Sequence, residues 1–208
     1  MTLEDVRHLS DDLGGRSGNV DHPGNDQVLV VFDLDNTLLA MAQGLGSDQW
    51  YDWQKQLSDE DPCGPATVAN RFAVQGAMYF ASAMRATQPD AAEQVRRIQD
   101  AGVRVIALTS RGTDYRLATF RELRRNGYDF RRSALPPAAG WPTDFTPDRG
   151  NRPARYEDGV FLTAGQNKGD MLVELLERTG TDLPAVVIMA DDKQKNLDAI
   201  KEAMAAQD

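Results

Sequence analysis

The chain has 208 residues, of which 41% are hydrophobic, and a formal net charge of −9 at pH 7. That length and composition suffice to bury one substantial core and perhaps a small accessory module, and the acidic balance argues against a protein that works on nucleic acid or anionic lipid. The single cysteine, Cys63, excludes an internal disulfide framework and a zinc site built from cysteines, and with only two histidines, His8 and His22, histidine chemistry is not expected.

The N-terminal segment, residues 1–27, predicts a lead-in to the fold. It begins with a short amphipathic turn or helix and continues into DDLGGRSGNVDHPGND, whose Gly, Asp and Asn content indicates a mobile segment. The five apolar residues that follow at 28–32, VLVVF, predict the first buried strand.

Residues 41–88 predict a small helical insert between the first strand and the rest of the fold. Two apolar repeats at helical spacing indicate its helices: Trp50, Trp53 and Leu57, and then Val68, Phe72 and Tyr79. The two tryptophans have two possible roles, as the core of the insert or as a surface on which a substrate rests.

Beyond residue 89, apolar strands alternate with amphipathic helices. The predicted strands are VRVIALT (103–109), YEDGVFLT (156–163) and AVVIMA (185–190). The predicted helices span 90–101, 113–126, 167–179 and 193–206. In the second helix Leu117, Phe120 and Leu123 should face inward, and RELRRNGYDFRR (121–132) indicates a solvated helix face and turn. The alternation predicts a Rossmann-like α/β fold, a three-layer parallel sheet flanked by helices, formed by 28–40 and 89–208.

Polar residues follow three of the predicted strands at the point where each strand ends. Asp33 comes after the first strand, Thr109 closes the second, and Asp191 with Asp192 follows the last. Because reactive groups in parallel α/β sheets gather outside the carboxyl ends of the strands, we expect these side chains to meet at one edge of the sheet.

The spacing of Asp33 and Asp35 predicts metal and phosphate chemistry. Two aspartates at i and i+2, together with a second aspartate pair, concentrate negative charge that is costly to bury unless a cation relieves it. Oxygen ligands of this kind suit Mg²⁺, which in turn favours a phosphate ligand. One carboxylate could attack phosphorus and form an aspartyl-phosphate while the other transfers protons, and Thr109 and Lys168 could neutralise the phosphoryl oxygens.

Each of these residues also has a purely structural interpretation. Asp33 and Asp35 could cap a helix and a turn, and Thr109 could satisfy backbone groups at a strand end. Lys168 could be a solvated lysine in the first turn of a helix. Arg111 has two open interpretations, contact with a substrate or an ion pair with a neighbouring acid.

Four segments resemble motifs I to IV of the haloacid dehalogenase (HAD) superfamily. In chain order they are DLDNTLL (33–39), LTSR (108–111), NKG (167–169) and MADDKQKN (189–196). The resemblance covers about residues 28–206 and implies a phosphatase-type hydrolase whose insert caps the site. Two further segments are similar to an uncharacterised bacterial subgroup defined only as a domain of unknown function, LGSDQW (45–50) and YEDGVFLTAGQNKG (156–169).

Carried over residue by residue, the resemblance implies a role for each motif. Asp33 would be the nucleophile and a Mg²⁺ ligand, and Asp35 would be the general acid and base, with its backbone carbonyl also reaching the metal. The substrate-binding residues would be Thr109, Ser110, Arg111 and Lys168. In motif IV Asp192 stands at the metal-binding position and Asp191 at the place usually held by glycine, so the division of metal binding between them stays open.

The resulting hypothesis is a Mg²⁺-dependent phosphatase that acts on a small phosphorylated substrate through an aspartyl-phosphate on Asp33. Two alternatives are a phosphotransferase that uses the same intermediate and a non-catalytic binding protein built on a HAD scaffold. No nucleic-acid partner is expected because the net charge is −9. No membrane partner is expected because no window reaches the roughly 18 apolar residues of a membrane span. No export signal is visible, which leaves a cytoplasmic protein, or a periplasmic or otherwise exported one whose leader has been removed; the oligomeric state stays open.

Overall fold

A five-stranded sheet with the order β5-β6-β4-β1-β7 forms the middle layer of the protein. It is seen in a computed structural model that describes residues 2–13, 24–58 and 60–207. β1, β4, β6 and β7 run parallel, and β5 pairs antiparallel with β6 at one edge. The strands are β1 (Val28–Phe32), β4 (Arg104–Thr109), β5 (Arg155–Glu157), β6 (Val160–Leu162) and β7 (Val186–Ala190). The predicted Rossmann-like α/β fold is confirmed.

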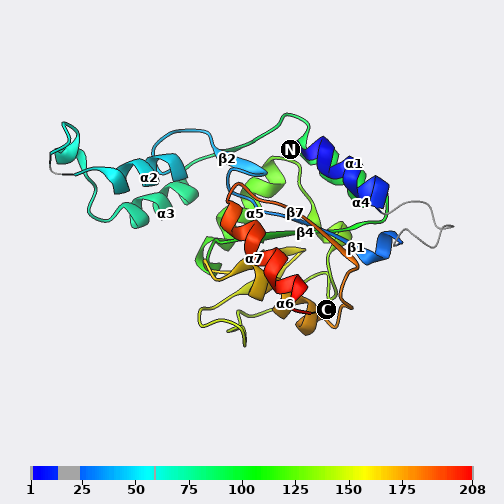
Figure 1. Ribbon diagram of the computed structural model, residues 1–208. Coiled ribbons are helices and arrows are strands. Elements are labelled where there is room, and N and C mark those ends of the chain that lie inside the picture. The colour runs from blue at the N-terminus through cyan, green and yellow to red at the C-terminus, as the bar shows by residue number, and fades with distance from the viewer. Residues whose placement is uncertain (1, 14–23, 59, 208) are drawn as a thin grey trace.

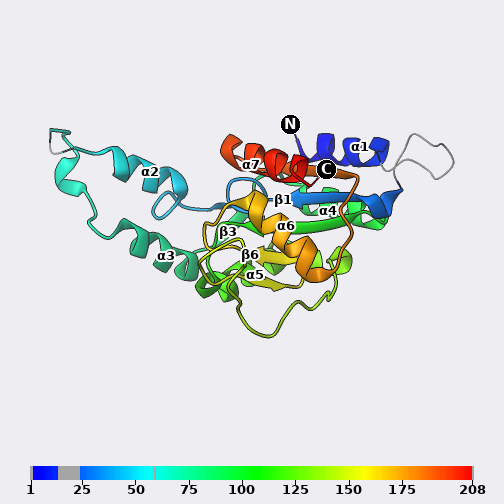
Figure 2. The same cartoon turned by 60° about the horizontal axis from the view of Figure 1, so that its bottom comes forward.

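Helices cover both faces of this sheet, which gives three layers (Figures 1 and 2). Three pack on one face, α1 (Leu3–Leu13), α4 (Ala91–Asp100) and α5 (Arg116–Arg125), and two on the other, α6 (Lys168–Thr179) and α7 (Gln194–Ala205). Alternate residues of β1 feed the two cores: Val28, Val30 and Phe32 on the first face, Leu29 and Val31 on the second. The described residues also form short 3₁₀ helices, η1 (Asn25–Gln27), η3 (Thr113–Tyr115) and η4 (Phe130–Ser133) in the core and η2 (Gly64–Ala66) in the insert.

The N-terminal helix α1 corresponds to the amphipathic turn or helix expected at the start of the chain. It buries Leu3 and Val6 and packs along α4. The mobile stretch expected after it falls on residues 14–23, which lie outside the described residues. None of the helices in the described part of the chain is long and apolar enough to cross a bilayer.

The first turn of α6 lies against α7, and a glycine makes this contact possible. A Cβ atom on Gly169 would lie 2.1 Å from the carbonyl oxygen of Ala199 and 2.7 Å from Cβ of Ala203. Only a residue without a side chain therefore allows α6 to begin this close to α7. The close packing brings the start of α6, and with it Lys168, to the carboxyl edge of the sheet beside the end of β7.

The segment YEDGVFLT forms a hairpin, so the prediction of one parallel strand there is wrong. β5 and β6 flank Asp158 and Gly159, whose φ values of 46° and 77° are those of a tight two-residue turn. Asp-Gly between apolar residues is the sequence signal for such a turn. Only β6 joins the parallel part of the sheet, at β4.

The insert predicted as helical at residues 41–88 also contains β-structure, which corrects that prediction. Its helices α2 (Asp48–Gln56) and α3 (Arg71–Ala81) project away from the sheet (Figure 1). An antiparallel two-stranded ribbon, β2 (Leu39–Met41) with β3 (Met84–Ala86), stands at their base. These strands are three residues long and pair across more than forty residues of sequence, so the local pattern carries no signal for them.

Three apolar side chains from the predicted helical repeats are exposed, and one of them, Leu117, was expected to face inward. Leu117 of α5 is 68% exposed, Phe72 of α3 is 61% exposed and Trp53 of α2 is 43% exposed. Val68 precedes α3 and so is not one of its residues. The exposure of Trp53 excludes one of the two roles considered for it, the core of the insert, whereas the exposure of Phe72 concerns the cleft described below.

The arginine-rich run 121–132 is also more than a solvated surface. Arg121 of α5 donates hydrogen bonds to the carbonyl oxygens of Tyr79, Phe80 and Ser82 at the end of α3. Glu122 is buried, and its carboxylate accepts the backbone N–H of Met84 in β3. Arg121 and Glu122 of α5 thus hold the end of α3 and the start of β3 against the core.

Candidate functional site

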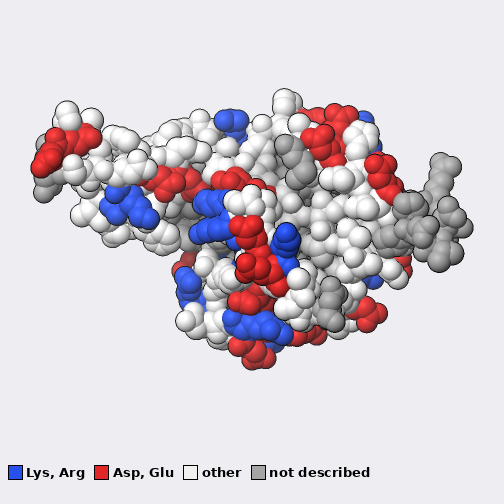
Figure 3. Space-filling model, viewed as in Figure 1, with Lys and Arg blue, Asp and Glu red and all other residues white. Residues whose placement is uncertain are grey.

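A cleft of about 580 Å³ opens between the insert and the carboxyl edge of the sheet. Five of the predicted site residues line it: Asp33, Asp35, Ser110, Arg111 and Asp192. The insert contributes the opposite wall from α2 and α3. Acidic and basic side chains are intermixed over the centre of the face drawn in Figure 3, so the net negative charge is not spread evenly there.

Lys168 lies behind the cleft and joins two of the predicted aspartates. Its Nζ is 2.6 Å from Oδ1 of Asp33 and 2.6 Å from Oδ2 of Asp191, and the residue is 2% exposed. Asn167 caps α6 by accepting the backbone N–H groups of Gly169 and Asp170, which fixes the direction in which Lys168 leaves the helix. The interpretation of Lys168 as a solvated first-turn lysine is wrong.

Asp33 is the most deeply perturbed acid of the site. Its backbone N–H continues the β1–β7 ladder by donating to the Ala190 carbonyl at 2.9 Å, one residue past the end of β1. The residue is only 5% exposed. Burial raises the pKa of Asp33 to about 7, with Asp35 and Asp191 adding to the rise and Lys168 opposing it. Within the described part of the chain, Oδ1 carries the bond from Lys168 and Oδ2 carries none.

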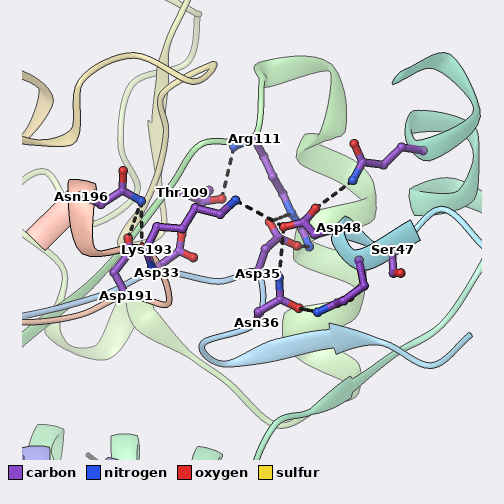
Figure 4. Close-up of polar contacts among 12 residues, drawn as sticks. Asp33, Asp35, Asn36, Ser47, Asp48, Thr109, Arg111, Asp191, Lys193 and Asn196 are labelled. Carbon is purple, nitrogen blue, oxygen red and sulfur yellow. Dashed lines mark hydrogen bonds and ion pairs between the residues drawn. The ribbon is translucent and has the colours of Figure 1, made fainter. Parts of the chain in front are cut away.

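The two neighbouring aspartates after β7 differ sharply in their surroundings. The Asp191 side chain is fully buried and accepts a hydrogen bond from Lys168. It also accepts the Asn196 amide at 2.8 and 3.0 Å, as Figure 4 shows, and the Lys193 backbone N–H at 2.8 Å. Asp192 is exposed to the cleft, and partial burial still raises its pKa. Asp191 is therefore occupied by protein donors, while Asp192 has free oxygens for a ligand.

Arg111 pairs with Asp35, the second of its two open interpretations. Its Nε donates to Oδ2 at 2.9 Å and its Nη2 to Oδ1 at 2.8 Å, a two-pronged pair visible in Figure 4. Nη1 donates to the Thr119 hydroxyl at 2.9 Å, and the guanidinium lies 4.6 Å from the centroid of the Tyr79 ring. Burial lowers the pKa of Arg111, but the charge of Asp35 and its hydrogen bonds outweigh burial and raise the pKa above its usual value. The Tyr79 hydroxyl adds a third donor to Asp35 at 3.3 Å.

Thr109 and Ser110 occupy different depths at the end of β4. Thr109 is fully buried, and its hydroxyl oxygen accepts the Arg111 backbone N–H at 3.2 Å. The structural role considered for a strand-end threonine is thus present, and within the described part of the chain the hydroxyl donates no hydrogen bond. Thr163, which was not singled out in the sequence, donates its hydroxyl to the Thr109 carbonyl at 2.9 Å. Ser110 is exposed in the cleft.

Asp48 of the insert is a site residue that the sequence reasoning missed. Its carboxylate accepts the amides of Asn36 at 3.1 Å and Gln75 at 2.8 Å and lies 3.6 Å from Nζ of Lys193 (Figure 4). It thereby connects α2 to the loop after β1 and to the residues before α7. Its position directly after Ser47, the N-cap of α2, is the one sequence feature that could have drawn attention to it. The local sequence does not indicate that this end of α2 packs against the edge of the sheet.

Comparison with known families gives one match. The profile of a family described as "Protein of unknown function (DUF2608)" matches residues 13–208. The chain belongs to the DUF2608 family. No curated protein and no solved structure matches it. The expected similarity to an uncharacterised domain is confirmed at this level, and membership of DUF2608 by itself carries no activity.

The acidic cluster of this DUF2608 chain has the donors that a hard cation uses. Carboxylate oxygens of Asp33, Asp191 and Asp192 lie within 4.8 Å of one another, and the buried cation Lys168 offsets only part of their charge. The set contains oxygen donors alone, which suits Mg²⁺ rather than softer metals. Asp33 and Asp192 would supply the direct ligands, because Asp191 is already held by protein donors.

The Arg111–Asp35 pair predicts a measurable cost for a change that keeps the charge. Arg111→Lys loses the planar fork, since one ammonium group cannot reach Asp35 and Thr119 together. We expect the free energy of unfolding to fall by about 2 kcal/mol, measured by urea denaturation. Arg124→Lys, at an exposed position on α5, is the control and should leave stability unchanged. Equal stability of the two variants would contradict this role of Arg111.

Proposed function

We propose that this protein is a Mg²⁺-dependent phosphomonoesterase of the HAD type that works through an aspartyl-phosphate on Asp33. The observation that carries the proposal is the bridge made by Lys168, whose ammonium lies 2.6 Å from both Asp33 and Asp191 at the carboxyl edge of a parallel sheet. The order of the four HAD-like motifs supports the same assignment. Phosphorylated small molecules are the proposed substrates.

In the first half of the reaction, Asp33 acts as the nucleophile. Oδ2 attacks phosphorus, the bond from phosphorus to the ester oxygen breaks, and the leaving alcohol takes up a proton from Asp35. Lys168 holds Oδ1 at 2.6 Å, which leaves Oδ2 as the attacking oxygen. Asp35 follows two residues later and lines the same cleft, so one carboxylate attacks while the other transfers the proton.

In the second half, water replaces the enzyme oxygen on phosphorus. Asp35 removes a proton from the water, phosphate leaves, and Asp33 is regenerated as a carboxylate. The fork of Arg111 fixes the orientation of the ionised Asp35 carboxylate that accepts the proton from water, which makes Arg111 a positioning residue.

Charge on the phosphoryl oxygens is neutralised by groups already gathered at the sheet edge. Lys168 supplies a fixed positive charge, Thr109 a hydroxyl hydrogen and Ser110 a further hydroxyl exposed in the cleft. Bound at Asp33 and Asp192, Mg²⁺ would add neutralisation of charge in the transition state. Because these groups are fixed before substrate arrives, they need little rearrangement during the reaction.

The proposal is tested by phosphate release from p-nitrophenyl phosphate and from a panel of metabolite phosphomonoesters. We expect turnover with Mg²⁺, loss of turnover with EDTA, and a fall in kcat of at least about 10³-fold in Asp33→Asn. Asp182→Asn, an exposed aspartate outside the cleft, serves as the control and should retain full activity. Turnover that survives EDTA or Asp33→Asn, or no turnover on any ester of the panel, would overturn the proposal.

A further inference from the structure

The wall of the cleft formed by the insert changes character along its length. Near the sheet edge it is polar: on α2 Asp48 binds Asn36, and on α3 the Tyr79 hydroxyl binds Asp35. α2 leads away from the sheet and α3 returns towards it (Figure 1). Farther out the wall becomes aromatic, with Tyr51 one turn beyond Asp48 and Phe72 at the start of α3.

The outer part of this wall is a pair of aromatic rings, the exposed Phe72 and the half-buried Tyr51. Phe72 lines the cleft with 61% of its surface exposed, and its ring meets Tyr51 edge to face at a centroid distance of 6.5 Å and an angle of 77°. Arg71 lies 5.7 Å from the centroid of the Tyr51 ring and supports it. Trp53, two residues after Tyr51 on α2, is also exposed but does not line the cleft. A flat ring of a ligand would cover the apolar surface that this pair exposes.

The spacing between the aromatic pair and the acidic centre limits the shape of such a ligand. Phe72 and Tyr79 are seven residues apart on one helix, which places them about 10 Å apart along its axis. Since Tyr79 touches Asp35, a ring resting on Phe72 is separated from the reacting phosphate by a spacer. A phenyl group joined directly to the phosphate would not reach this far.

We propose that the cleft takes a phosphomonoester in which an aromatic ring is joined to the phosphate through a spacer the size of a sugar, the chemistry of a nucleoside monophosphate. The ring rests on Phe72 and Tyr51, and the phosphate lies at Asp33. Arg152 and Lys195 line the cleft from the core and offer hydrogen-bond donors to polar atoms of the ring and spacer. This inference rests on the proposed phosphomonoesterase function and names its substrate class.

The test compares three substrates at saturating Mg²⁺: adenosine 5′-monophosphate, ribose 5-phosphate and phenyl phosphate. We expect kcat/KM for adenosine 5′-monophosphate to exceed that for ribose 5-phosphate by about tenfold or more, because the base adds one stacking contact. Phe72→Leu should reduce that ratio by about tenfold. Trp53→Leu removes an exposed aromatic from the same insert and should leave the ratio unchanged.

A binding measurement gives a second readout that needs no turnover. Adenosine 5′-monophosphate is titrated into Asp33→Asn in a calorimeter, with either Phe72→Leu or Trp53→Leu added. The first combination should weaken binding by about tenfold and the second should leave it unchanged. Thermal unfolding of each variant shows that a weaker interaction does not come from a lost fold.

The outcomes separate this inference from the function on which it rests. Hydrolysis of none of the three esters, with turnover of another ester of the panel, would overturn the substrate class alone, and no turnover on any ester of the panel would overturn both. Hydrolysis with an adenosine-to-ribose ratio near one, or a ratio that Phe72→Leu leaves unchanged, would overturn the substrate class and leave the phosphatase in place. A preference for phenyl phosphate over the nucleotide would overturn it as well, because the ring would then lie beside Tyr79.

Discussion

Replacing Lys168 with methionine is expected to destabilise the protein by about 3–5 kcal/mol and to reduce phosphatase activity by about 10²–10³-fold. Lys168 is 2% exposed and bonded to two carboxylates. Methionine fills a similar volume but leaves both carboxylates buried without their cation, which costs far more than the loss of a surface ion pair. Urea denaturation in EDTA measures the stability, and phosphate release with Mg²⁺ measures the activity.

Two further variants test the cause of this loss. Lys201→Met removes an exposed lysine from α7 and should change neither quantity. Adding Asp191→Asn to Lys168→Met removes one of the stranded charges, so the double variant should recover part of the lost stability. A Lys168→Met protein as stable as the wild type would contradict the arrangement described for the site.

The affinity of the metal-free protein for Mg²⁺ is expected to increase about 50-fold between pH 5 and pH 7, because Mg²⁺ must displace a proton from Asp33. Burial raises the pKa of Asp33 to about 7 in the absence of metal. Well below that pH, each further drop of one pH unit reduces the deprotonated fraction of Asp33, and with it the Mg²⁺ affinity, about tenfold. Burial also raises the pKa of Asp192, which acts in the same direction. Calorimetric titration of Mg²⁺ from pH 5 to pH 8 measures the effect.

The same shift sets the sign of the pH dependence of stability. The pKa of an aspartate in the unfolded chain is about 3.9, so between roughly pH 4 and pH 7 the folded protein keeps a proton that the unfolded chain has released. Without metal, stability therefore falls as pH rises through this window, by on the order of 4 kcal/mol in total. Asp33→Asn should remove this dependence, and Mg²⁺ should offset it at pH 8. Equal Mg²⁺ affinity of the wild type at pH 5 and pH 8 would contradict the account.

Features that depend on long apolar runs were predictable from the sequence. β1, β4 and β7 lie within two residues of their predicted bounds, because buried parallel strands leave an uninterrupted apolar pattern. The meeting of Asp33 with Asp191 and Asp192 followed from the same reasoning, since strands of one parallel sheet end at one edge. Which of the two later aspartates is free for a ligand emerged only from their hydrogen bonds.

Features that depend on contacts between distant segments were not predictable. β2 and β3 are short and pair across the whole insert, and the role of Asp48 exists only because α2 begins beside the loop after β1. Leu117 was expected inside by helical spacing, yet the face of α5 that packs on the core is the one carrying Ala118 and Glu122. In each case tertiary packing decides between alternatives that the local pattern leaves equal.

The most direct test of the central claim is to trap phosphate on Asp33. Wild-type protein and Asp33→Asn are mixed with radiolabelled p-nitrophenyl phosphate and Mg²⁺, quenched in acid within the first turnover, and digested for peptide mapping. We predict label on the wild-type peptide that contains Asp33, sensitive to hydroxylamine as an acyl phosphate is, and no label in the variant. Turnover of the ester with no label at Asp33 would contradict the account.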